Sequence, residues 1–296
     1  MDIAAEIAKR AQETEQRILP YLPREEGYQR TVIAAMNYSF RAGGKRLRPM
    51  LMWETYRMFG GKSDIIEPFM AAIEMIHTYS LIHDDLPAMD NDTYRRGQKT
   101  THIVYGEAMA ILAGDGLLNY AYETAIGALS KEPGNPNVGK ALMVLAQQAG
   151  IYGMVGGQTV DVETDGTSEV TREQLDFIYR LKTGALIRAA MQIGGILAGA
   201  TKKEQEVLDR AAEKIGLAFQ IQDDILDVTA TTETLGKPAG SDARNGKATY
   251  VTYEGLERAA ADVEQYSHEA VTLLSSLVVK NEFLMKLIEH LIHREK

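Results

Sequence analysis

The chain has 296 residues, of which 45% are apolar and 25% charged, so it holds enough apolar sequence for a sizeable core. Its net charge of −9 argues against a nucleic-acid-binding surface, because phosphate backbones are bound by an excess of Lys and Arg. The absence of cysteine excludes disulfides and thiolate zinc sites. The N-terminal region is charged throughout, unlike a signal peptide, and no apolar run reaches the roughly 18 residues of a membrane span. We therefore expect a soluble cytoplasmic protein without a membrane span.

Helix-favouring residues dominate the chain, and alternating β-branched runs between tight turns are scarce. We expect a single all-α domain over residues 1–296, because no linker divides the chain. Thr171 and Gln174 form a capping box at the start of one helix. Prolines, glycines and caps place the helices over 2–19, 25–42, 49–59, 65–86, 107–129, 138–155, 171–181, 185–198, 203–228, 256–277 and 281–295.

An acidic stretch follows the apolar helix expected over 65–86. It contains four aspartates, namely Asp84, Asp85, Asp90 and Asp92. Crowded carboxylates repel one another unless a cation lies between them, and a hard cation such as Mg²⁺ takes oxygen ligands. A solvated acidic loop is the alternative for this stretch alone. Asp84 and Asp90 do not align on a straight helix, but Pro87 ends the helix and lets Asp90 turn back toward Asp84.

A second acidic cluster, Asp223, Asp224 and Asp227, lies in the helix expected over 203–228. Asp223 and Asp227 are four residues apart, so their carboxylates share one helix face. An ordinary charged helix surface explains this cluster equally well when it is taken alone. If the two clusters face each other, they would hold several Mg²⁺ ions, and a diphosphate is the ligand that suits such an array.

Several basic residues lie beside glycine or proline in this acidic chain: Lys45, Arg48, Arg95, Arg96, Lys182, Lys237 and Lys247. Glycine allows the backbone to approach a ligand closely. Arginine binds phosphate oxygens through its planar fork, and lysine acts as a point charge. Each cation alone is most simply an ordinary surface residue. Together with two aspartate clusters, they predict a site that binds diphosphate.

Four stretches carry a family resemblance. They are Gly-Gly-Lys-Arg-Leu-Arg-Pro at 43–49, Asp-Asp-Leu-Pro-Ala-Met-Asp at 84–90 followed by Arg-Arg-Gly at 95–97, Lys-Thr-Gly at 182–184, and Phe-Gln-Ile-Gln-Asp-Asp-Ile-Leu-Asp at 219–227. In content and order they resemble the motifs of the trans-isoprenyl diphosphate synthases, across nearly the whole chain. The first aspartate stretch, with two inserted residues, is similar to that of bacterial farnesyl diphosphate synthases and of bacterial or plant geranylgeranyl relatives.

The resemblance implies antiparallel helices around a deep central cavity, a homodimer and three Mg²⁺ ions. The metal ligands that it implies are Asp84, Asp85, Asp90, Asp223 and Asp227. The allylic diphosphate would be held by Arg95, Lys182, Thr183, Gln220 and Lys237. Isopentenyl diphosphate would be held by Lys45, Arg48, His77 and Arg96. His77 would otherwise be interpreted as a packed core histidine.

The expected reaction begins with ionisation of the allylic diphosphate, whose leaving charge Mg²⁺, Arg95, Lys182 and Lys237 stabilise. The double bond of isopentenyl diphosphate then attacks the carbocation inside an apolar cavity. Carbonyl groups at Lys182-Thr183 and the Gln220 side chain would supply partial negative charge. The proton is lost to the released diphosphate, because no side chain is an obvious base. The loop 229–248, with Lys237 and Lys247, is expected to close over the site and exclude water.

Product length is expected to depend on Tyr79. This residue lies five positions before Asp84, about 7.5 Å along a helix with a rise of 1.5 Å per residue. A bulky aromatic residue here resembles the floor that stops chain growth in the family at fifteen carbons or fewer, although a plain core aromatic is the alternative. Ser80 is small, so the floor would rest on Tyr79 with Ile76 below it. We expect farnesyl diphosphate as the main product.

Three other functions fit parts of the pattern. A terpene cyclase shares an aspartate motif and magnesium, but it lacks the isopentenyl-binding set that Lys45, Arg48 and Arg96 would provide. A non-catalytic partner subunit typically lacks one aspartate cluster, whereas both are intact here. A geranylgeranyl diphosphate synthase is the nearest alternative, because it differs only in product length.

Overall fold

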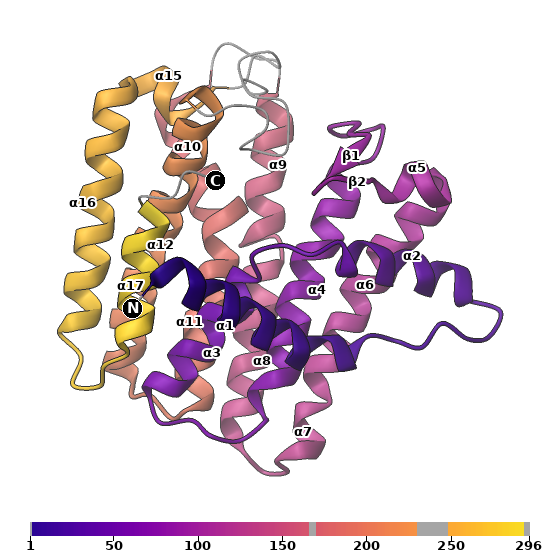
Figure 1. Cartoon of the computed structure of the whole chain (residues 1–296), viewed down its shortest axis with the longest axis horizontal. Helices are drawn as coiled ribbons and strands as arrows, with labels where there is room; N and C mark the ends of the chain where they lie inside the picture. Colours follow the sequence, from indigo (N-terminus) through magenta and orange to yellow (C-terminus); the bar gives the residue numbers. More distant parts are fainter. Residues whose placement is uncertain (1, 166–169, 230–247, 293–296) are drawn as a thin grey trace. The chain divides into compact units, whose positions relative to one another are not determined.

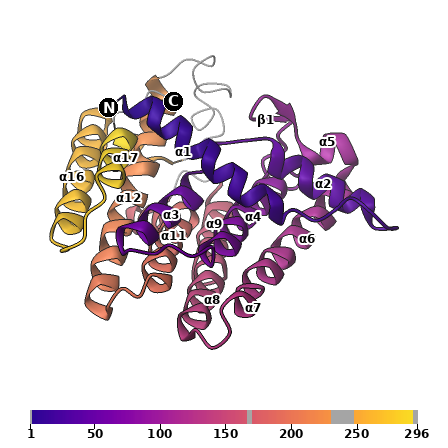
Figure 2. The same ribbon diagram turned by 60° about the horizontal axis from the view of Figure 1, so that its bottom comes forward.

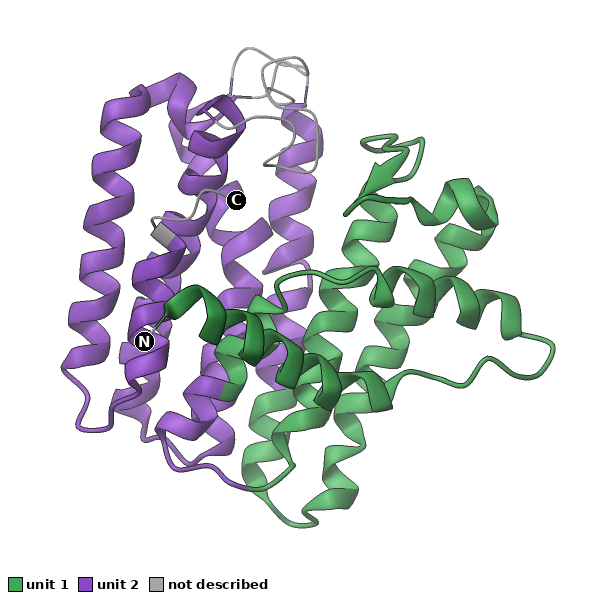
Figure 3. Cartoon of the chain, in the orientation of Figure 1, with its two compact units in different colours: residues 1–53, 63–142 green, residues 54–62, 143–296 purple. Residues whose placement is uncertain are grey.

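The structure, a computed structural model, describes residues 2–165, 170–229 and 248–292 (Figure 1). Helices form nearly all of the regular structure in these residues, with one short two-stranded hairpin, so the predicted all-α class is confirmed. Contacts divide the chain into two compact units (Figure 3): unit 1 is Met1–Trp53 with Ser63–Leu142, and unit 2 is Glu54–Lys62 with Met143–Lys296. The single-domain expectation stays a prediction.

Unit 1 is built around α4 (Ile66–Asp84), which is buried along most of its length. An apolar helix with no polar face is stable only when neighbours enclose it. In unit 1, α4 packs mainly against α6 (Glu107–Ile126), and the two helices lie side by side in Figures 1 and 2. The remaining elements that begin in unit 1 are α1 (Ile3–Ile18), η1 (Leu19–Tyr21), α2 (Arg30–Arg41), α3 (Leu47–Met58), β1 (Tyr94–Arg95), β2 (Gln98–Lys99), α5 (Thr101–Tyr105), α7 (Ala128–Lys131) and α8 (Pro136–Ala149).

Gly114 explains the close approach of α6 to α4. A Cβ atom at Gly114 would lie 2.0 Å from Nε2 of His83, so only glycine leaves room for this imidazole. The His83 ring nitrogen lies 3.2 Å from the Ile111 carbonyl oxygen on the same helix. His83 therefore fills the contact between the two helices.

The β1–β2 hairpin was not predicted. Tyr94 pairs with Lys99 and Arg95 with Gln98, which leaves Arg96 and Gly97 as a two-residue turn. Both turn residues have positive φ, 54° and 76°, as a type I′ hairpin requires. The strands are too short for an alternating apolar pattern, so only the glycine after Arg96 signalled the turn.

Unit 2 is built around α12 (Lys202–Thr229), which packs against α11 (Gly184–Leu197) and α16 (Leu256–Ser275). Gly216 allows the first contact, because a Cβ atom there would lie 2.9 Å from the Gly184 Cα atom. The other elements of unit 2 are α9 (Met154–Thr164), α10 (Arg172–Ile178), the π-helical turn η2 (Tyr179–Thr183), α15 (Tyr250–Glu254) and α17 (Glu282–Ile292). The predicted capping box of Thr171 and Gln174 is confirmed at the start of α10.

Two predicted boundaries in unit 2 were wrong. The helix expected over 138–155 ends at Ala149, and α9 begins at Met154 after a turn at Gly153, where a Cβ atom would lie 2.1 Å from the Gln148 carbonyl oxygen. Gly156 and Gly157, expected to end a helix, lie inside α9. A Cβ atom at Gly157 would lie 2.2 Å from the backbone nitrogen of Lys182. This glycine therefore serves helix packing and not termination.

Among the described residues, no helix combines the length and apolar character needed to cross a bilayer.

Candidate active site

The chain turns back on itself after α4, as the spacing around Pro87 predicted. The Asp90 N–H donates to the Asp84 carbonyl oxygen at 2.8 Å, and the Asn91 N–H donates to the Leu86 carbonyl oxygen at 3.1 Å. Asp84 is half-buried at the helix end, and Asp90 is exposed. The backbone thus holds the two predicted ligands close together at one end of unit 1.

Asp85 differs from its neighbours because it points into unit 1, where it is 4% exposed. Its Oδ1 atom accepts a hydrogen bond from Nε of Arg95 at 2.6 Å. Burial raises the pKa of the Asp85 carboxyl to about 6, although the positive charge of Arg95 opposes this shift. Asp85 therefore anchors the β1–β2 hairpin to the end of α4, and its role as a metal ligand stays a prediction.

Most of the residues predicted to bind isopentenyl diphosphate gather in unit 1. Burial holds the pKa of His77 well below its ordinary value, and the nearby charges of Arg48, Arg96 and Arg95 lower this pKa further. A guanidinium nitrogen of Arg96 donates to the Gly43 carbonyl oxygen. A Cβ atom at Gly44 would lie 2.7 Å from the Arg96 guanidinium carbon, and the φ of 131° at Gly44 favours glycine there. Three arginines, Arg48, Arg95 and Arg96, thus gather around a neutral His77 in unit 1.

Lys45 and Arg46 are adjacent cations with opposite environments. Lys45 is exposed, whereas Arg46 is 2% exposed and adopts φ 49°. The Arg46 guanidinium bonds to Glu74 and Glu15, each at 2.8 Å. Arg46 is thus a structural residue, and the chain presents Lys45 to solvent next to Gly44.

The π-helical turn η2 presents Lys182 and Thr183, two residues predicted to bind the allylic diphosphate. The Thr183 hydroxyl donates to Oε1 of Gln220 on α12 at 2.7 Å. Nζ of Lys182 lies 2.6 Å from a carboxylate oxygen of Asp161 on α9. Turns of this kind recur at functional sites, because they break the regular hydrogen-bond pattern of a helix. The structure therefore joins Thr183 to Gln220 and shows that Lys182 has an anionic partner.

Asp161 and Tyr179 contact predicted site residues, and the sequence interpretation did not single them out. Asp161 holds Lys182, and the Tyr179 hydroxyl donates to Oδ2 of Asp224. The one available signal for Asp161 was the glycine pair at 156–157, because adjacent glycines inside a helix indicate close backbone packing. Tyr179 carried no signal beyond its position three residues before Lys182.

The three aspartates of α12 are not equivalent. Asp224 is 4% exposed and accepts hydrogen bonds from the Tyr179 hydroxyl and from the Tyr250 N–H. Asp227 is 2% exposed, while Asp223 is half-buried. Asp223 is thus the most accessible carboxylate of the cluster, which fits its predicted leading role.

The donor set fits magnesium. Asp84, Asp90 and Asp223 offer carboxylate oxygens, which a hard cation prefers. Within residues 2–165, 170–229 and 248–292, no three His, Asp or Glu side chains gather as a complete metal-binding group. Mg²⁺ commonly takes one or two carboxylates and completes its coordination with substrate phosphate oxygens and water. Taken unit by unit, Asp84 with Asp90 in unit 1 and Asp223 in unit 2 each offer the one or two carboxylates that such an ion takes.

The three residues predicted to control product length lie on α4. Tyr79 is 6% exposed, and its ring packs edge-to-face against His83 with centroids 5.8 Å apart. Burial, together with nearby Tyr122 and Asp84, raises the pKa of Tyr79 to about 12, so its hydroxyl stays neutral. The Ser80 hydroxyl donates to the His77 carbonyl oxygen on its own helix, and Ile76 is fully buried. Tyr79 is thus the bulky side chain of the three.

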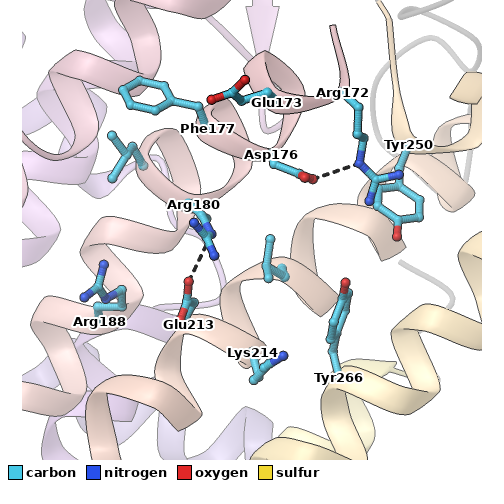
Figure 4. A pocket seen from close by; sticks show the side chains of 12 residues that line it. Arg172, Glu173, Asp176, Phe177, Arg180, Arg188, Glu213, Lys214, Tyr250 and Tyr266 are labelled. Carbon is cyan, nitrogen blue, oxygen red and sulfur yellow. Dashed lines mark hydrogen bonds and ion pairs between the residues drawn. The ribbon is translucent and has the colours of Figure 1, made fainter. Parts of the chain in front are cut away.

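A groove of about 720 Å³ lies within unit 2 (Figure 4). It is lined by residues of α10, η2, α11, α12, α15 and α16, including Arg172, Arg180, Glu213, Tyr250 and Tyr266. None of the predicted site residues lines this groove. Lys237 and Lys247, together with most of the loop expected over 229–248, lie outside the described residues.

Comparisons with known proteins agree with the motifs. The polyprenyl synthetase family model matches residues 29–278. The chain is 48% identical over 236 residues to a geranylgeranyl diphosphate synthase of Cyanophora paradoxa, covering 80% of this chain and 78% of the relative. It is 43% identical over 293 residues to a farnesyl diphosphate synthase of Escherichia coli (strain K12), covering 97% and 96%.

A solved structure extends this similarity to the fold. The apo crystal structure of an FPP/GFPP synthase from Zymomonas mobilis matches with a TM-score of 0.86 and 31% identity, covering 98% of this chain and 99% of that one. The motifs at 43–49, 84–97, 182–184 and 219–227 all fall inside the matched region. The chain therefore belongs to the polyprenyl synthetase family of prenyltransferases.

Proposed function

We propose that this prenyltransferase condenses dimethylallyl or geranyl diphosphate with isopentenyl diphosphate and releases farnesyl diphosphate as its main product. The observation that carries the proposal is the gathering of Arg48, His77, Arg95 and Arg96 around one end of α4, next to the Asp84–Asp90 turn. The three arginines of this group, beside carboxylates, suit a diphosphate that arrives with metal ions.

Asp84, Asp90 and Asp223 would hold Mg²⁺, with Asp85 and Asp227 as further candidates and three ions as the expected number. The bound ions would neutralise the charge that develops on the departing diphosphate. Lys182 and Thr183 would bind the allylic diphosphate from η2, after Lys182 exchanges Asp161 for phosphate oxygens. Arg95 and Gln220 would complete this group, together with Lys237.

Isopentenyl diphosphate would be bound by Lys45, Arg48 and Arg96. The allylic carbon–oxygen bond would break first, with its electron pair leaving on diphosphate, and the double bond of isopentenyl diphosphate would then form the new carbon–carbon bond with the carbocation. The proton lost from the adjacent carbon passes to the released diphosphate. His77 is held neutral by its depressed pKa, so it would act as a hydrogen-bonding group and not as a cation.

Product analysis tests the proposal. Purified protein is incubated with magnesium, isopentenyl diphosphate and each allylic diphosphate in turn, and the products are sized. Asp84→Ala and Asp223→Ala should lower turnover by about 100-fold or more, because each removes a group that stabilises leaving charge. Asp64→Ala, at an exposed aspartate of unit 1 paired with Lys131, is the matched control and should keep normal turnover. Near-normal turnover in both site variants would refute the assignment.

A twenty-carbon product is the second candidate. It is favoured by the 48% identity to a geranylgeranyl diphosphate synthase. The same assay separates the two, because a geranylgeranyl diphosphate synthase would extend added farnesyl diphosphate and a farnesyl diphosphate synthase would leave it unchanged.

We also propose a homodimer. Ile111 and Leu112 on α6 are 41% and 54% exposed, and Ile103 and Val104 on neighbouring α5 are 43% and 46% exposed. Grouped exposed apolar side chains mark interaction surfaces. Sedimentation of the wild type should give twice the chain mass, and Leu112→Glu should shift the protein toward the monomer. A monomeric wild type would refute the proposal.

A further inference from the structure

A set of side-chain hydrogen bonds joins η2 to α12 at two points. Thr183 Oγ1 donates to Gln220 Oε1 at 2.7 Å, and Gln220 Nε2 donates to Asp224 Oδ1 at 3.4 Å. The Tyr179 hydroxyl donates to Asp224 Oδ2. Tyr179 and Thr183 are four residues apart in η2, and Gln220 and Asp224 are four apart in α12. We call these four residues the η2–α12 network.

The start of α15 is bonded to the same network. The Tyr250 N–H donates to Asp224 Oδ2 at 2.8 Å and lies 2.9 Å from the Tyr179 hydroxyl oxygen. The rings of Tyr179 and Tyr250 stack with centroids 6.4 Å apart. The guanidinium carbon of Arg172 lies 4.4 Å from the centre of the Tyr250 ring, and Figure 4 shows the two side chains together. The Asp224 carboxylate on α12 is thus bonded to two other elements, η2 and α15.

The Tyr179–Asp224 end of the network lies inside an apolar core. Tyr179 and Tyr250 belong to a buried cluster with Ile178, Ile221 and Val263, and Asp224 is 4% exposed. A buried carboxylate is tolerated only when hydrogen bonds replace its water, and an apolar side chain of similar volume usually stabilises a core at least as well. Stability of the core alone therefore does not explain an aspartate at this position.

The other end of the network, at Thr183 and Gln220, explains why an aspartate lies at position 224. Thr183 and Gln220 belong to the set proposed to bind the allylic diphosphate, and Asp223, the proposed metal ligand, directly precedes Asp224. Hydroxyl, amide and carboxylate groups form hydrogen bonds in preferred directions, so their bonds fix the position of η2 along α12. Apolar packing, which has no such directional requirement, would allow the two elements to slide.

We propose that Tyr179 and Asp224 are positioning residues, which fix η2 on α12 so that Lys182, Thr183 and Gln220 fit the allylic diphosphate. This inference rests on the proposed function. Asp224 then serves as an anchor, and Asp223 serves as the metal ligand.

The first test is Tyr179→Phe, which removes one hydroxyl and keeps the ring. Its KM for the allylic diphosphate should rise by about tenfold, the effect of losing one hydrogen bond at a buried charged group. Its KM for isopentenyl diphosphate should stay within about twofold, because that substrate is bound by unit 1 residues. Tyr266→Phe is the matched control, since Tyr266 on α16 packs against the same core cluster and also loses one hydroxyl; both constants should stay unchanged.

The second test distinguishes the proposed anchor, Asp224, from the proposed metal ligand, Asp223. It also tests the proposal if Tyr179→Phe does not fold. Asp224→Asn keeps the shape of the side chain and should raise the allylic KM, while the magnesium concentration for half-maximal rate stays within about twofold of the wild type. Asp223→Asn should shift that magnesium concentration by about tenfold or more.

Equal rises in both KM values for Tyr179→Phe, or a magnesium shift in Asp224→Asn as large as in Asp223→Asn, would overturn the proposal. Failure of the proposed function would instead be seen in the wild type, as no product from any allylic diphosphate.

Discussion

The ammonium group of Lys182 lies 2.6 Å from a carboxylate oxygen of Asp161, and this contact joins η2 to α9. Both side chains are partly exposed, at 29% and 21%. An ion pair of this kind is weak enough to exchange for a doubly or triply charged diphosphate. In the proposed function, the value of this ion pair would be geometric, because it would keep Lys182 extended toward α9 until a phosphate replaces Asp161.

Gly157 should be as important for this geometry as Asp161. A Cβ atom at Gly157 would lie 2.2 Å from the Lys182 backbone nitrogen, which cannot move without displacing η2. Gly157→Ala should therefore lower kcat/KM for the allylic substrate by about 100-fold, the effect of misplacing a substrate-binding group by about 1 Å. Steady-state kinetics with varied allylic diphosphate measures this change in kcat/KM.

Gly139→Ala provides the matched control, because a Cβ atom on this α8 residue meets nothing within 4 Å. It should keep normal kinetics and raise the free energy of unfolding by about 0.5–1 kcal/mol, the helix preference of alanine over glycine. Equal kinetics in the two variants would contradict the proposed role of Gly157.

Lys45 and Arg46 should give opposite phenotypes. Arg46→Ala leaves Glu74, which is 2% exposed, without its buried partner and should lower the free energy of unfolding by about 3–5 kcal/mol. Lys45→Ala should change that free energy by less than about 0.5 kcal/mol. Its KM for isopentenyl diphosphate should rise by about tenfold, because a charge-assisted phosphate contact is lost. Urea unfolding and kinetics measure the two effects, and comparable destabilisation by both variants would argue against this division.

This pair also shows where sequence interpretation ends. The chain carries two adjacent cations after Gly43-Gly44, and nothing in their identity says which one turns inward. Arg46 does so because Glu15 and Glu74, from two other helices, provide buried carboxylates for it. Asp223 and Asp224 differ for the same reason, since Tyr179 and Tyr250 approach α12 from one side only. Such choices depend on tertiary partners far away in sequence.

Sequence signals predicted the structure correctly where the residues that determine it are close together in the chain. Pro87 ended α4 and allowed Asp90 to approach Asp84, and the Thr171 capping box started α10 as expected. Gly156 and Gly157 were misinterpreted because glycine permits both helix termination and close packing, and only the neighbouring η2 decides between them.

His77 should make the protein less stable in mild acid. Burial and the charges of Arg48, Arg96, Arg95 and Arg46 hold its folded-state pKa well below 6.5. As pH falls below 6.5, the unfolded chain gains a proton that the folded chain does not, so stability is lost down to the folded-state pKa. The free energy of unfolding should therefore fall more steeply in the wild type than in His77→Gln between about pH 7.5 and 5.5, by about 1.4 kcal/mol for each pH unit below 6.5.

Urea unfolding at several pH values provides the measurement. His268→Gln, on the exposed surface of α16, is the matched control and should follow the wild type. If His77→Gln has the same pH dependence as the wild type, the depressed pKa of His77 is not the cause.

Tyr79 should set the product length through the size of its ring. Its side chain is 6% exposed on α4 and lies five residues before Asp84, where a lengthening tail would extend away from the diphosphate. Tyr79→Ala removes the ring and should yield products longer than fifteen carbons, as judged by chromatography of the dephosphorylated alcohols. Tyr79→Phe keeps the ring and should keep the wild-type product. Because emptying a core position destabilises a protein by about 3–5 kcal/mol, the comparison is made below the unfolding transition of Tyr79→Ala. Unchanged product length in a folded Tyr79→Ala variant would assign the floor to other side chains.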